Sequence, residues 1–165
     1  MDTCISLNDE VFFLNEDVIA LDQRSIGFVT EKALQNKRGR ARICAHKNPE
    51  DSLHEMVIAI RSDSYICPHR HLGKVESFHL IEGKGEVVLF NEKGEVIRRI
   101  LLSKKDNFYY RLNASLYHTV LIHSPILVIH ETTNGPFSPP EFAPFAPLEG
   151  ASTTREYIKS LQCFF

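Results

Sequence analysis

Eight short segments rich in β-branched and aromatic residues follow one another between Glu55 and about Thr132, separated by turn residues. They read EMVIAI, SYICPHRH, ESFHLI, GEVVLF, EVIRRILL, FYYRL, HTVLI and PILVIHE. Strands at this spacing are typical of an all-β sandwich or barrel rather than of alternating strands and helices. Residues 91–94 (Asn-Glu-Lys-Gly) join two segments as a hairpin, because Gly94 can take the positive φ that the loop needs.

Helices are predicted on either side of this strand-rich region. Residues 22–37 carry apolar positions near a 3.6-residue period, namely Ile26, Val29, Ala33 and Leu34, and Gly39 suits a helix end. Residues 153–156 have the Thr-x-x-Glu form of a capping box, which predicts a short helix with an apolar stripe of Tyr157, Ile158, Leu161 and Phe165.

The segment GPFSPPEFAPFAP, after Asn134, is expected to be extended, and its phenylalanines suggest that it docks on the barrel. We therefore expect a single domain over residues 1–165. It comprises an N-terminal helical region (1–39), a barrel core (about 40–135) and a C-terminal extension (136–165).

Charge and cysteine content narrow the expected partners and location. The 19 basic residues nearly balance the 21 acidic ones, so the chain lacks the positive field that nucleic acid or an anionic membrane requires. The start resembles no secretory signal, and no apolar run approaches the ~20 residues that span a bilayer. The four cysteines are far apart, as expected of reduced thiols. We expect a cytoplasmic protein.

One group of residues has the composition of a metal site. His69 and His71 are two apart, so on a strand both imidazoles share a face. Residues 72–75, with Gly73, allow a turn that returns Glu76 beside them, and Gly83 permits the next tight turn. A fourth ligand is expected from a remote strand, where His118 is suitably placed. Such nitrogen and oxygen donors suit one divalent ion of Fe, Mn, Ni, Co or Zn.

Further residues are expected around this site. By alternation Tyr65 and Cys67 share the face of His69, while Phe78 shares that of Glu76 and His79 points away. Arg40 and Arg42, with Arg38, lie on one face of a strand and could clamp a carboxylate or diphosphate, although a strand that bears arginines is more often a solvated face or a dimer edge. Either His130 or Glu131 must face inward. Burying a neutral imidazole costs less, so we favour His130 as a catalytic acid or base.

These residues carry a resemblance to a known family. The pattern His-x-His-x4-Glu-x6-Gly over residues 69–83 matches the first cupin motif, whereas Asn-x-Ser-x-x-His over 113–118 departs from the usual Pro-x-Gly-x-x-His. With RGRARICAH, NGPF and FAPLE, the chain resembles the WbuC family of cupin metalloproteins over about residues 38–149. The resemblance implies a double-stranded β-helix (jelly-roll) barrel and a link to O-antigen and lipopolysaccharide gene clusters.

Three functions fit such a site. The first is a homodimeric metal-dependent enzyme of isomerase or epimerase type, acting on a small anionic or sugar-like molecule. It follows from the site's net charge of about one positive unit, which favours hydroxy-carbonyl ligands. The second is an Fe(II)-dependent dioxygenase. The third is a non-catalytic ligand-binding or scaffold protein in which the metal stiffens the barrel.

Overall fold

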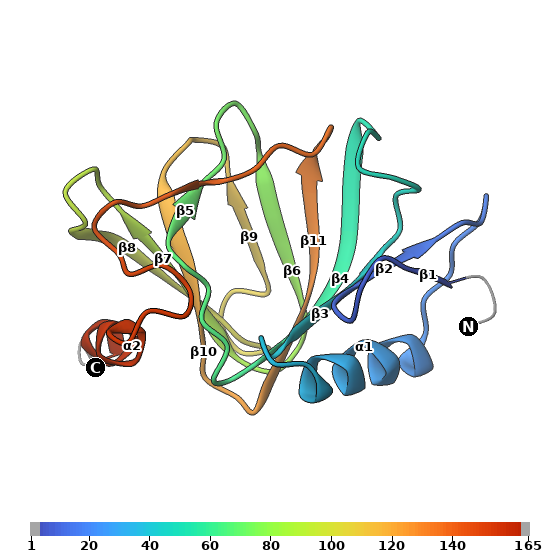
Figure 1. Cartoon of the computed structure of the whole chain (residues 1–165), viewed down its shortest axis with the longest axis horizontal. Coiled ribbons are helices and arrows are strands. Elements are labelled where there is room, and N and C mark those ends of the chain that lie inside the picture. Colours follow the sequence, from blue (N-terminus) through green and yellow to red (C-terminus); the bar gives the residue numbers. More distant parts are fainter. Residues whose placement is uncertain (1–3, 163–165) are drawn as a thin grey trace.

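Two β-sheets face each other in the computed structural model, which describes residues 4–162 (Figure 1). The seven-stranded sheet comprises, in spatial order, β1 (Cys4–Ser6), β2 (Val11–Leu14), β3 (Arg40–Cys44), β4 (Leu53–Arg61), β11 (Ile126–Asn134), β6 (Glu76–Glu82) and β9 (Tyr109–Leu112). The five-stranded sheet comprises β12 (Glu141–Phe142), β5 (His69–Arg70), β10 (Tyr117–Ile122), β7 (Gly85–Phe90) and β8 (Val96–Leu102). The predicted all-β jelly-roll class is confirmed.

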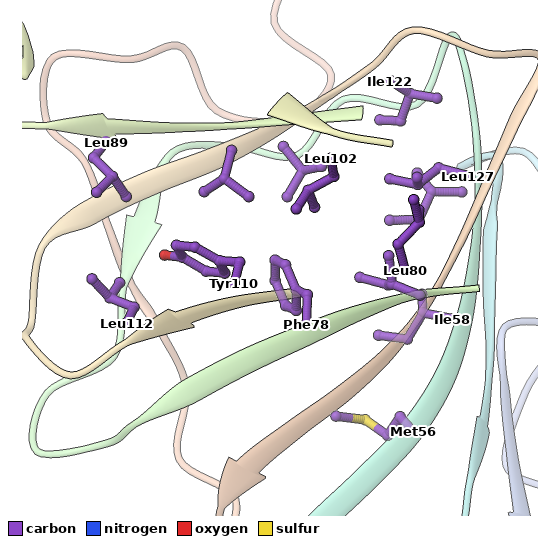
Figure 2. Close-up of a cluster of buried hydrophobic side chains, with 14 of the residues drawn as sticks. Met56, Ile58, Phe78, Leu80, Leu89, Leu102, Tyr110, Leu112, Ile122 and Leu127 are labelled. Carbon is purple, nitrogen blue, oxygen red and sulfur yellow. The ribbon is translucent and has the colours of Figure 1, made fainter. Parts of the chain in front are cut away.

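Apolar side chains from both sheets fill the space between them (Figure 2). On β4, alternate residues Met56, Ile58 and Ile60 point into this interior. Val57 and Ala59 point to the opposite face and are also buried. Because both faces of β4 are covered, its sequence is a continuous apolar run rather than an alternation.

Helix α1 (Gln23–Gln35) covers the outer face of the seven-stranded sheet. It begins at Asp22, whose side chain accepts hydrogen bonds from the backbone of Arg24 and Ser25. The predicted positions Ile26, Val29 and Ala33 are buried against the sheet, but Leu34 is 52% exposed. Leu34 was therefore wrongly assigned to the packed stripe, because it lies at the edge of that stripe.

Residues 4–14 differ from the predicted helical region, since they form β1 and β2. Strand β2 alternates between its two faces and pairs with β3, the parallel pair in an otherwise antiparallel sheet. Phe12 and Leu14 lie under α1, whereas Val11 and Phe13 pack against the inner core. A four-residue strand is too short to produce a period in the sequence, so this element went unpredicted.

The remaining connections follow the predictions more closely. Residues 91–94 form the hairpin between β7 and β8, with Gly94 at φ +83°. After β11 the chain runs along one end of the sheets to β5, where it contributes β12 (Figure 1). Phe145 then packs on Phe90 and Tyr117, as expected of a docked extension.

The chain ends its described part in helix α2 (Thr154–Gln162), which buries Leu161 against the five-stranded sheet. Phe165, the last residue of the predicted stripe, lies outside the described residues. Among residues 4–162, neither helix has the length and apolarity needed to cross a bilayer.

Candidate metal centre

The short strand β5 positions two histidines opposite a third. His69 on β5 is the register partner of His118 on the neighbouring β10. His71 follows β5 directly. The ring centroid of His69 lies 5.0 Å from that of His71 and 4.6 Å from that of His118. Residues separated by 49 positions therefore meet because β5 and β10 are adjacent.

Two of these rings are oriented by the backbone. The Nδ1 atom of His69 lies 2.8 Å from the carbonyl oxygen of Cys67, and that of His118 lies 3.1 Å from the carbonyl oxygen of Leu116. A proton on each Nδ1 would donate to its carbonyl, which leaves Nε2 with a free lone pair. This arrangement is the usual support of metal-binding histidines.

Glu76, the first residue of β6, brings a carboxylate from the other sheet. Its Oε2 lies 3.3 Å from Nε2 of His71, and its Oε1 lies 3.1 Å from Nε2 of His118. One donor atom from each of the four residues lies within 4.8 Å of the others. Despite their proximity, Oε1 of Glu76 and Nε2 of His118 are buried without a hydrogen-bond partner.

Buried polar atoms without partners are unfavourable unless something else compensates them. A divalent cation at the point where these atoms converge would do so, and three imidazoles with one carboxylate are donors that such ions accept. The residues present therefore fit a metal ion.

Electrostatics favour the same conclusion. Burial alone would raise the pKa of Glu76, but the adjacent His118 and His71 outweigh it and hold this pKa well below its usual range. Burial, together with His118, lowers the pKa of His69 to about 4. For His118, Glu76 outweighs burial and raises the pKa. The ionised carboxylate thus favours positive charge at this point, whether a proton or a metal ion supplies it.

The four residues lie on the wall of a cavity of about 320 Å³. Of the residues that the sequence placed in a pocket, Arg40, Arg42, Cys67 and Phe78 line it. Cys67 is buried and is not in a disulfide. The roles of these residues toward a ligand stay predictions.

Tyr65 was also expected to line this cavity, but it lies elsewhere. Its hydroxyl donates to the carbonyl oxygen of Pro147 at 2.7 Å, and its ring packs edge-on to Tyr157. The chain is not a strand at residues 64–68, so the alternation of β5 does not extend back to Tyr65. Tyr65 is therefore not part of the lining of the cavity beside the candidate metal centre.

The predicted inward orientation of His130 was wrong, because Glu131 is the inward residue. Glu131 lines the cavity, whereas His130 lies on the outer face, 3.8 Å from Glu55. Two facts explain the error. The neighbours Val128 and Ile129 are both buried, one under α1 and one in the core, so the apolar pattern does not reveal which face is inner. The inner position also borders a cavity, so Glu131 is only partly buried rather than enclosed by packed apolar side chains.

Burial and the neighbouring Glu76 raise the pKa of Glu131 to about 8. Glu131 is thus a site residue that sequence reasoning missed. The sequence would have indicated which alternate residues of β11 face inward only if one face of this strand had been polar.

The C-terminal extension contributes further lining residues, which sequence reasoning also missed: Phe137, Pro140, Phe142 and Glu149. Glu149 accepts hydrogen bonds from Arg38 at 2.9 and 2.8 Å and from Arg40 at 2.9 Å. Arg40 is therefore ion-paired within the chain. The sequence feature that pointed to this part of the cavity lining was the density of phenylalanines after residue 135. It indicated that the segment docks, but not where.

Comparison with known proteins supports the fold. A family model described as a domain of unknown function (DUF6016) matches residues 21–102, just under half of the chain. A comparison with curated proteins returns no match. The capsular polysaccharide assembling protein CapF from Staphylococcus aureus is similar in structure, with a TM-score of 0.53 and 18% identity over 65% of this chain and 30% of CapF.

A cupin domain of Cnp3 from Schizosaccharomyces pombe also resembles this chain, with a TM-score of 0.48 and 14% identity over 59% of this chain and 66% of that one. This chain therefore spans less than two thirds of either structure. At these identities the likeness concerns the fold alone.

Proposed function

We propose that this chain is a metal-dependent cupin protein that binds and modifies a small anionic or sugar-like molecule. The observation that carries the proposal is the convergence of three imidazoles and one carboxylate, two of whose donor atoms are unpartnered, on the wall of a cavity. His69, His71, Glu76 and His118 would hold one divalent ion of Fe, Mn, Ni, Co or Zn. Bound there, the ion would supply a Lewis acid that polarises a hydroxy-carbonyl oxygen.

The chain's own residues support an anionic or polar ligand. Arg42 lines the same cavity, and among residues 4–162 its guanidinium forms no ion pair with a carboxylate. Arg42 is therefore positioned to bind a negative group, because arginine recognises carboxylate and phosphate through paired donors. Glu131 replaces His130 as the side chain in place for proton transfer.

Within this function we favour isomerisation or epimerisation, since both need a polarised carbonyl and a nearby proton carrier. The motif resemblance to the WbuC family, and the likeness in fold to a protein named for capsular polysaccharide assembly, support a role in surface polysaccharide synthesis. We extend the proposal to one cupin domain over residues 1–165, a cytoplasmic location and a homodimer.

Metal content is the first test. We expect about one divalent ion per chain in the wild-type protein and an affinity at least ~100-fold weaker in His118→Gln, because a direct donor is lost and even a residue that only supports a ligand costs about 10- to 100-fold. His79→Gln is the matched control, since His79 is exposed and outside the cavity. Metal analysis with a competing chelator measures both. Equal affinity in the two variants would rule out this centre.

Turnover is the second test. Each metal-loaded form is incubated with nucleotide sugars and hydroxy acids, and products and oxygen uptake are measured. Conversion without oxygen uptake is the expected result, whereas oxygen consumption with Fe(II) would establish the dioxygenase instead. Binding without any conversion would leave a ligand-binding protein.

A further inference from the structure

We propose that the ligand of the metal centre is elongated and carries an uncharged apolar group, which occupies a second cavity beside the first. This inference rests on the proposed function and narrows its ligand class. The second cavity has a volume of about 340 Å³. Its apolar lining comes from the N-terminal region, from β3 and β4, and from the C-terminal extension: Leu7, Val11, Phe13, Cys44, Met56 and Phe137.

The two cavities are adjacent. Arg42, His71, Glu131 and Phe137 line both of them. His71 is one of the four residues of the candidate metal centre, so a ligand that reaches the metal lies at the entrance to the second cavity.

Arg42 marks the boundary between a charged and an apolar region. Within residues 4–162 the only side-chain hydrogen bond of Arg42 is a long one, 3.9 Å, to Sδ of Met56. Arg42 interacts with the carboxylate of Glu131 only at longer range, so its guanidinium is available to a ligand, whereas Arg40 is paired with Glu149. An anionic group bound by Arg42 would lie next to Met56, one of the apolar residues of the second cavity.

Besides the shared Arg42, the lining of the second cavity includes one lysine, Lys74, whose ammonium donates a hydrogen bond to the carbonyl oxygen of Pro136 at 2.6 Å. The lining also includes two histidines. His46 and His54 lie face to face there, with ring centroids 4.0 Å apart and an interplanar angle of 4°. Nδ1 of His46 and Nε2 of His54 contact backbone atoms of Glu55 and Pro49. Burial lowers the pKa of His46, which keeps that ring neutral. The stacked rings, whose nitrogens are engaged with the backbone, suit contact with an apolar group rather than with a second phosphate.

Size gives the same answer. Pockets for drug-sized ligands span roughly 300–1,000 Å³, so each cavity alone is at the lower end of that range. A single hydroxy acid or monosaccharide would leave the second cavity empty of ligand. A ligand with a polar head and an apolar portion would use both.

A pair of probes that differ only in their apolar portion tests the inference. Glycolate and 2-hydroxyoctanoate share the hydroxy-carboxylate head, and their dissociation constants are measured by calorimetry on metal-loaded and on chelator-treated protein. We expect 2-hydroxyoctanoate to bind at least 10-fold more tightly in both forms, because each buried methylene adds about a factor of four.

Ser138→Trp should remove this preference and leave glycolate binding unchanged. Ser138 is exposed and lines only the second cavity, so the variant should fold and place an indole in that space. Ser152→Trp is the matched control, because Ser152 is exposed and lines neither cavity.

The outcomes separate this inference from the proposed function. Equal affinity for the two probes, a preference that survives Ser138→Trp, or no binding of either probe overturns the second cavity as a ligand site. The protein could instead fail to bind metal and still prefer 2-hydroxyoctanoate in a way that Ser138→Trp abolishes. This result overturns the proposed function but supports the second cavity as an apolar ligand site.

Discussion

His46 and His54 illustrate how the surroundings of one side chain set its chemistry. Both rings are buried, and they stack on each other instead of facing the metal donors. Burial lowers the pKa of His46, and the charge of His54 lowers it further, while a backbone contact with Glu55 opposes the shift. Protonation of His46 therefore disfavours the folded state.

Unfolding free energy should depend on pH through this residue. Below the ordinary histidine pKa of 6.5, the unfolded chain binds a proton that folded His46 does not, so stability is full above pH 6.5 and falls as pH decreases toward the lowered pKa. We expect His46→Phe to lose less unfolding free energy between pH 7.0 and pH 5.5 than the wild-type protein does. Urea titrations at the two pH values, with chelator present, measure this difference. An unchanged loss, equal to that of the exposed-site control His79→Gln, would contradict this assignment.

Single residues also show what the sequence could and could not predict about the site. His69, His71 and Glu76 follow from strand alternation and one glycine turn, which are local properties. His118 required a guess about a remote strand. The orientation of His130 and Glu131 depended on α1 covering the outer face of the sheet, which no local pattern reveals.

Elements that connect β-strands depend on particular glycines. Gly83 lies between β6 and β7 at φ +86°, and a Cβ atom there would overlap the carbonyl oxygen of Ile126 and lie 2.6 Å from Oγ of Ser124. Gly73 has a similar φ, +69°, but nothing lies within 4 Å of its added Cβ. Comparing substitutions at Gly73 and Gly83 therefore distinguishes the cost of backbone strain alone from the cost of strain with steric overlap.

Gly83→Ala should therefore destabilise the protein more than Gly73→Ala. We expect about 1 kcal/mol for Gly73→Ala, from backbone strain alone, and at least ~2 kcal/mol more for Gly83→Ala, because the neighbouring strand must shift. Urea denaturation monitored by circular dichroism measures both. Equal losses would mean that the turn after β6 adapts without displacing β11.

Elements with a strong local signal were predictable, and those defined by pairing partners were not. The 91–94 hairpin and α1 have turn and capping chemistry in their own residues. Strand β2 instead depends on pairing with β3, and β12 on pairing with β5. Such short edge strands carry too few residues to be read without their partners.

At the scale of the whole molecule, the candidate metal centre joins the two sheets. His69 and His118 belong to strands of the five-stranded sheet, whereas Glu76 belongs to the seven-stranded sheet. An ion held by all of them would connect the two layers at one end of the core. A ligand that binds only the folded state stabilises it by mass action.

Metal should therefore raise the melting temperature of the wild-type protein. At a free concentration about 100 times the dissociation constant, the gain is about 2.7 kcal/mol, which corresponds to roughly 5–10 °C for a chain of this size. Calorimetric scans with metal and with chelator measure it. At the same metal concentration His118→Gln should gain no more than about 0.4 kcal/mol, roughly 1 °C, because its affinity is at least ~100-fold weaker. A wild-type protein indifferent to metal would speak against the centre.

The wall formed by residues 135–149 has an evolutionary consequence. Phe137, Pro140 and Phe142 reach the cavity from a segment whose strand, β12, has only two residues and pairs at the sheet edge. Substitutions or insertions in this segment can reshape the space for a ligand without altering the strands that carry the histidines. Homologous chains with identical metal donors can thus diverge in ligand preference while their barrels remain alike.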